Sequence, residues 1–162
     1  MAYSVTTLAW GMISFEDGYK SAGEWDNAVD QIKWVTDYLI RCHPTKYEFY
    51  GQIGDGNEDH SIWGRPEEYP FSRKSTKITK SSPGSDLAGE ASAALSAASM
   101  VFALNGDAAN AAECLTHARE LFEFADQYRY VISNLKYFKQ REKLNQNQSR
   151  ENSVSKIILD NF

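Results

Sequence analysis

Residues 83–102 read PGSDLAGEASAALSAASMVF, and this stretch decides the fold class. Pro83 and Gly84 turn the chain, and Ser85 or Asp86 can then cap a helix because their side-chain oxygens accept backbone N–H groups. Apolar residues recur at helical spacings through the rest of the stretch. The run of Ala and Ser implies a close approach to other helices. The expected core-facing positions are Leu87, Ala91, Ala94, Leu95, Ala98, Val101 and Phe102.

Three further segments show the helical spacing of apolar residues. They are residues 5–19, residues 25–42 and a segment after Asn105-Gly106-Asp107. The first is apolar on two sides, which is typical of a helix buried on two sides. The second ends at His43-Pro44, since a residue before proline is pushed out of the helical region. Helices joined in pairs predict an all-α fold.

Between the second and third helices lies a long connection. Residues 47–54 alternate as a short strand or extended segment does. Residues 54–86 show no clear periodicity, and connections of this length are usually functional or disordered. Disordered linkers are poor in aromatic residues, whereas this segment contains His60, Trp63, Tyr69 and Phe71, together with Arg65. We therefore predict one long irregular but ordered binding loop.

Charge and composition exclude several classes of protein. The net charge of −5 argues against nucleic-acid binding, which needs clustered Lys and Arg. The sequence holds no apolar run long enough to span a membrane and no signal-peptide pattern. Two cysteines, Cys42 and Cys114, are too few for a disulfide framework. Residues 130–162 are basic, rich in Asn and Gln and poor in apolar residues, so we expect a poorly packed tail after residue 129.

Three stretches together resemble the catalytic domain of glycoside hydrolase family 9, most closely the animal cellulases of insect type. They are MAYSVTTLAWGMISFEDGY, YEFYGQIGDGNEDHSIWGRPEEYPFSRKSTKI and SSPGSDLAGEASAALSAASMVF. The resemblance covers residues 1 to about 129 and implies roughly the first third of an (α/α)6 barrel. It also implies hydrolysis of internal β-1,4-glucosidic bonds with inversion. Residues 130–162 do not share the resemblance, so the expected division is 1–129 and 130–162.

Inverting hydrolysis needs one carboxylic acid to protonate the leaving oxygen and one carboxylate to activate water. The resemblance puts the family's base, in an Asp-Ala-Gly-Asp motif, just ahead of the segment that matches Met1–Trp10. It puts the acid, a Glu, far beyond the last matching residue. The expectation is therefore a fragment without catalytic residues. The alternative is a catalytically inactive glucan-binding or vestigial helical protein.

Two positions carry over from the family as substrate-binding residues. The resemblance implies that His60 hydrogen-bonds a sugar hydroxyl and that Trp63 stacks on a glucose ring. A pyranose suits both, since it has an apolar face and a rim of hydroxyl groups. The alternative is that His60 caps a turn and Trp63 plugs the loop into the core. Tyr50 is a further candidate for lining the cleft, and Arg65 either donates to hydroxyls or pairs with Glu67 or Glu68.

No metal or cofactor is predicted. Asp55 and Asp59 lack the remainder of a calcium loop and are expected to be solvated turn residues. His43 and His117 have no motif around them and are expected to be ordinary residues. The expected partner is a β-1,4-glucan such as cellulose, and the family resemblance implies an extracellular protein. Because the chain matches only about a third of the barrel, the neighbouring helices should be missing. We therefore expect the flanks of Trp10, Ile13, Ala94 and Ala98 to be uncovered.

Overall fold

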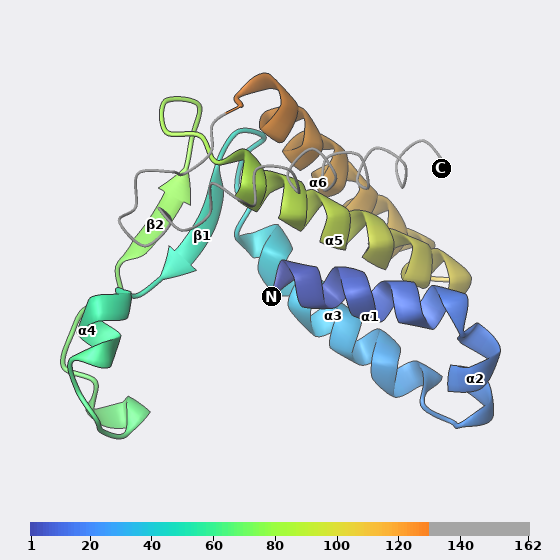
Figure 1. Ribbon diagram of the computed structural model, residues 1–162. Helices are drawn as coiled ribbons and strands as arrows, with labels where there is room; N and C mark the ends of the chain where they lie inside the picture. The colour runs from blue at the N-terminus through green and yellow to red at the C-terminus, as the bar shows by residue number, and fades with distance from the viewer. Residues whose placement is uncertain (130–162) are drawn as a thin grey trace, which may run out of the picture.

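The computed structural model describes residues 1–129, and most of them lie in helices (Figure 1). The long helices are α1 (Ala2–Ser14), α3 (Trp25–Arg41), α5 (Ser85–Leu104) and α6 (Ala108–Gln127). Shorter elements are α2 (Glu16–Ser21), β1 (Phe49–Ile53), α4 (Gly56–His60), the 3₁₀ helix η1 (Pro66–Glu68) and β2 (Ser75–Ile78). The four predicted helical segments are all present.

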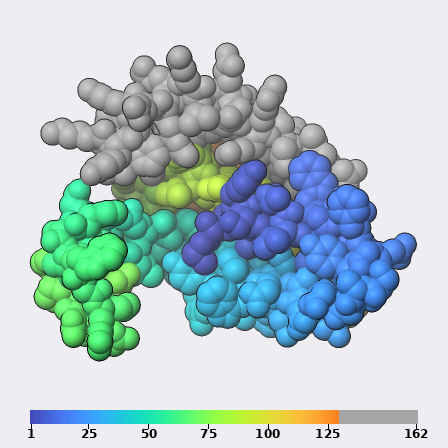
Figure 2. Space-filling model, turned by 60° about the horizontal axis from the view of Figure 1, so that its bottom comes forward, coloured from blue at the N-terminus to red at the C-terminus, as the bar shows by residue number. Residues whose placement is uncertain are grey.

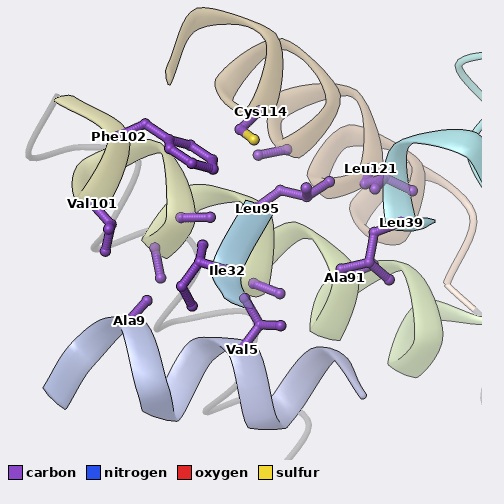
Figure 3. Close-up of a cluster of buried hydrophobic side chains, with 14 of the residues drawn as sticks. Val5, Ala9, Ile32, Leu39, Ala91, Leu95, Val101, Phe102, Cys114 and Leu121 are labelled. Atoms are coloured by element: carbon purple, nitrogen blue, oxygen red, sulfur yellow. The ribbon is translucent and has the colours of Figure 1, made fainter. Parts of the chain in front are cut away.

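The core lies around α5, which packs between α1 and α6 and also meets α3 (Figure 3). Small residues on α5 let the backbone of α6 approach closely. Ser92 Oγ donates to the carbonyl of Ala118, and Ser99 Oγ donates to the carbonyl of Ala111, each at 2.8 Å. These bonds matter because a buried hydroxyl without a partner costs stability. The Ala and Ser run therefore fixes the distance between the two helices.

Helix α5 is long and apolar enough to cross a membrane, if length and composition alone are considered. However, 72% of its apolar window is buried inside the fold, as in the core helix of a globular domain.

Several predictions about the helices need correction. A single helix over residues 5–19 is wrong, because Phe15 (φ −129°, ψ 38°) leaves the helical region and separates α1 from α2. Phe15 is exposed rather than buried. Neither Ser85 nor Asp86 is the N-cap of α5, which is Gly84. Asp86 lies in the first turn instead, where its Oδ1 accepts from the backbone N–H of Leu87 at 3.0 Å.

The expectation that Ala94 and Ala98 lie uncovered is wrong as well. Both are completely buried, because α1 and α6 cover the two sides of α5. Trp10 is exposed as expected. On α3 the predicted apolar stripe is confirmed by the burial of Trp25, Val29, Ile32, Thr36 and Leu39.

The long connection was predicted to be irregular. This is wrong in part, because the connection contains α4, η1 and β2. Strand β2 pairs antiparallel with β1, with Phe49 opposite Ile78 and a bulge between Tyr50 and Gln52. Gly51, at the bulge, lies close to α5. A Cβ at this position would come within 2.6 Å of Leu87 Cδ1. The missing side chain therefore lets the hairpin rest against the start of α5.

Candidate functional site

Residues 54–74 extend from the end of the β1–β2 hairpin, away from the helices (Figure 1). In the space-filling view this segment (green) stands apart from α1 and α3 (blue), and the surface between them is hollowed (Figure 2). The segment carries three of the four predicted substrate-binding residues, and the fourth, Tyr50, lies on β1.

The exit from the hairpin depends on Gly54 and Asp55. Gly54 adopts a φ of 90°, which L-residues with a side chain rarely adopt. Its N–H donates to the carbonyl of Lys74 at 2.7 Å, closing the base of the segment. Asp55 Oδ1 then accepts from the backbone N–H groups of Asn57 (2.8 Å) and Glu58 (3.3 Å). Asp55 is thus the N-cap of α4, which agrees with its predicted role as a turn residue.

A small cluster of side chains holds the far half of the segment. The rings of Tyr69 and Phe71 meet edge to face with centroids 5.5 Å apart, and the Arg73 guanidinium carbon lies 5.3 Å from the Tyr69 ring. Burial raises the pKa of Tyr69, and the carboxylate of Asp59 adds to this. Residues 69, 71 and 73 alternate, so they share one side of an extended chain. That alternation is the sequence signal by which these supporting residues could have been found.

Trp63 lies fully exposed between α4 and η1. The alternative that it plugs the loop into the core is therefore wrong. A fully exposed indole offers both faces to a ligand, at no cost to the packing of the protein.

His60 is the last residue of α4 and is exposed. Its Nδ1 lies 2.5 Å from the carbonyl oxygen of Gly56, which is the turn-capping role that was considered as the alternative. Because a carbonyl can only accept, the neutral ring must carry its proton on Nδ1. The lone pair of Nε2 is then free to accept from an external hydroxyl group. The capping contact and a sugar contact are therefore compatible.

Arg65 is exposed, and its carbonyl accepts from Glu68 N–H at 3.0 Å where η1 begins. Among residues 1–129 its guanidinium forms no ion pair, so pairing with Glu67 or Glu68 is wrong. Tyr50 is partly buried against the core, and Lys77 Nζ lies 5.6 Å from the centre of its ring. Within residues 1–129 no hydrogen bond, ion pair or ring contact joins any two of His60, Trp63, Arg65 and Tyr50.

The sequence model described as "Glycosyl hydrolase family 9" matches residues 1–153. The chain belongs to glycosyl hydrolase family 9. Endoglucanase 19 of Arabidopsis thaliana is 50% identical over 129 residues, which are 80% of this chain and 20% of that protein. The helices of this family 9 chain form part of the (α/α)6 barrel seen in the solved family 9 cellulases.

Two solved structures illustrate the match. The endoglucanase of the termite Nasutitermes takasagoensis is 46% identical with a TM-score of 0.87, over 98% of this chain and 36% of that one. The cellulase Cel9M of C. cellulolyticum, solved in complex with cellobiose, is 30% identical with a TM-score of 0.78, over 97% of this chain and 39% of that one.

The family 9 chain spans about a fifth of the length of the curated relatives that it matches. The alignment with the Arabidopsis thaliana enzyme covers 80% of the chain, whereas the family match covers residues 1–153. The boundary near residue 129 stays a prediction, and residues 130–162 lie outside the described part of the structure. The insect type also stays a prediction, because plant, bacterial and termite enzymes align at similar identities of 50%, 46% and 46%.

Proposed function

We propose that residues 1–129 form one wall of the substrate cleft of an endo-β-1,4-glucanase that hydrolyses cellulose with inversion. Membership of family 9 and the match to endoglucanases of plants, bacteria and a termite support this proposal. The observation that carries it is the complete exposure of Trp63 on a segment that projects beside a hollowed surface.

Each candidate residue has a distinct role in this proposal. Trp63 stacks on the apolar face of a glucose unit, where a ring excludes water from the sugar C–H groups. His60 accepts a hydrogen bond from a sugar hydroxyl through Nε2, which its contact with Gly56 leaves free. Arg65, without an ion-pair partner in residues 1–129, donates to hydroxyl groups further along the glucan. Tyr50 lines the cleft from β1 with its partly exposed ring.

The binding role can be tested on the ¹⁵N-labelled chain by titration with cellotetraose. The indole N–H signal of Trp63 should shift and saturate, and Trp63→Ala should abolish the response of the remaining signals. Trp34, exposed on α3, is the matched control and should not shift. Equal shifts at Trp34 and Trp63, or none at either, would contradict a sugar-binding role for this segment.

We further propose that the 162-residue chain does not hydrolyse cellulose by itself. Inverting hydrolysis requires two carboxyl groups about 6.5–9.5 Å apart, and loss of either proton transfer removes a large part of the rate. Resemblance to the family assigns neither role to an Asp or Glu of this chain. Release of reducing sugar from carboxymethyl-cellulose should equal the buffer blank from about pH 4 to about pH 8. Clear release at any pH in that range would refute this proposal.

A catalytically inactive glucan-binding protein is the second candidate. Both candidates predict binding without hydrolysis for the 162-residue chain, so the two assays are repeated on the protein purified from the organism. Hydrolysis there supports the endoglucanase, and binding without hydrolysis supports this second candidate. We also propose an extracellular location, which the resemblance to family 9 endoglucanases supports. No nucleic acid is a proposed partner, consistent with the net charge of −5.

A further inference from the structure

The fold brings together three polar side chains that are separated in sequence, at a place distinct from residues 54–74. His43 follows the end of α3, while His117 and Glu120 lie on α6. The Nδ1 atoms of the two histidines are 2.7 Å apart, and their rings meet at 72°. One possible ligand atom from each of the three residues lies within 4.8 Å of the others.

The backbone holds these groups in place. His117 and Glu120 are three residues apart, so both lie on the same face of α6. That helix is anchored in the core by Cys114, Ala118 and Leu121. His43 is only 2% exposed, and its backbone N–H donates to the backbone carbonyl of Ile40 at 2.9 Å. Two of the three groups therefore lie on a helix, and the third lies in the connection just after α3, where burial and a backbone hydrogen bond hold it.

The hydrogen bonding of the cluster is incomplete. Nε2 of His43 is buried and has no hydrogen-bond partner. The carboxylate of Glu120 forms no hydrogen bond or ion pair within residues 1–129. The facing Nδ1 atoms can share one hydrogen bond, in which one neutral ring donates and the other accepts. Two facing imidazole nitrogens beside a carboxylate that has no partner within residues 1–129 are an arrangement that a bound cation would explain.

The ionisation of His43 agrees with a ligand role. Burial is the main cause that lowers the pKa of His43. The nearby backbone of Lys46 raises this pKa, although Nε2 has no hydrogen bond of normal geometry. The neighbouring His117 lowers the pKa further, and Glu120 raises it. The neutral imidazole is the form that coordinates a metal.

We propose that His43, His117 and Glu120 bind one divalent ion of the zinc class, through a nitrogen of each histidine and an oxygen of the carboxylate. Two imidazoles and one carboxylate are a ligand set that zinc accepts. Zinc–nitrogen bonds of about 2.0–2.1 Å at tetrahedral angles place two ligand nitrogens roughly 3.3 Å apart. The present 2.7 Å therefore has to widen by roughly half an ångström, and His117, which is partly exposed, can move by that much.

The bound ion would join the end of α3 to the middle of α6 and so stabilise the helical body. An ion that binds only the folded chain raises the melting temperature by mass action. With free zinc about 100 times above Kd, the expected rise is roughly 5–10 °C for a domain of this size.

The histidine content of the chain provides a matched control. The sequence has only three histidines, and residues 130–162 contain neither His nor Cys. The experiment titrates zinc chloride into the chelator-treated 162-residue chain, with calorimetry for affinity and Co²⁺ absorption for ligand geometry. His117→Ala and Glu120→Gln are preferred to a change at His43, because both residues are only partly buried. His60→Ala removes the exposed histidine instead.

We expect one zinc ion per chain, with unchanged affinity in His60→Ala. Affinity should fall at least about 10-fold in His117→Ala and Glu120→Gln, because loss of even a group that only orients a ligand costs about 10- to 100-fold. Circular dichroism of each variant confirms that it keeps its helices. The proposal is overturned if the helical wild-type chain shows no saturable zinc binding. It is equally overturned if His117→Ala binds like wild type, or if His60→Ala loses the binding. The glucan titration uses other residues, so failure there would leave this result unaffected.

Discussion

An apolar surface on α1 should make the 162-residue chain self-associate. Tyr3 and Trp10 are seven residues apart, which is two helical turns, and they are 68% and 67% exposed. Fully buried aromatic side chains cover about 150–250 Å² each, so this pair leaves roughly 200–340 Å² in water. At about 25 cal/mol per Å² the uncovered surface is worth about 5–8 kcal/mol. That is comparable with the whole stability of a folded domain, about 5–15 kcal/mol.

The change that tests this is the double variant Tyr3→Gln, Trp10→Gln. If association covers about half of the pair's surface, the variant should weaken self-association roughly 100-fold. Sedimentation velocity from about 1 to about 100 µM measures the effect, with dye binding as a second reading of exposed apolar surface. Trp63→Gln is the matched control, since it removes an equally exposed ring from another part of the molecule.

A monomeric wild-type chain at the highest concentration, with no dye binding and a sharp reversible thermal transition, would refute the reasoning. The residues outside the described range would then have to cover α1. An unchanged association constant in the double variant, with a lower one in Trp63→Gln, would show that the contact lies on the loop instead.

Three further outcomes follow from packing and backbone geometry. Phe124→Ala should lower the free energy of unfolding by about 3–5 kcal/mol in denaturant titrations, since this ring is 1% exposed, whereas Phe15→Ala should change it by less than about 0.5 kcal/mol. Gly54→Ala should cost about 1–2 kcal/mol, because a side chain is strained at a φ of 90°; an unchanged midpoint would mean that the segment relaxes freely. Burial raises the pKa of the Cys114 thiol to about 12, so at about pH 8 its thiolate fraction is only about 10⁻⁴. Iodoacetamide should label Cys114 only after unfolding, and rapid labelling of the folded chain would contradict its burial.

Where the sequence predicts well, the signal is local. The four helical segments were found because apolar residues repeat every three or four positions, and the stripe on α3 is buried as expected. The helical spacing on α5 correctly placed Ala94 and Ala98 toward the core, but the further expectation that their flanks lie uncovered was wrong, because it considered absent neighbours and not the close approach of α1 and α6. The break at Phe15 was missed because the helical spacing of apolar residues continues across it.

The sequence by itself determined the family, the helices and the position of the exposed segment, because motifs and periodicity are properties of neighbouring residues. Only the tertiary structure decided that Ser75–Ile78 is a strand, since its polar residues carry no alternating pattern and its hydrogen bonds come from β1. The same holds for His43 and His117, which are 74 positions apart and meet at 2.7 Å. Contacts of this kind depend on how the helices pack around α5, because each partner's position is set by side chains elsewhere in the chain.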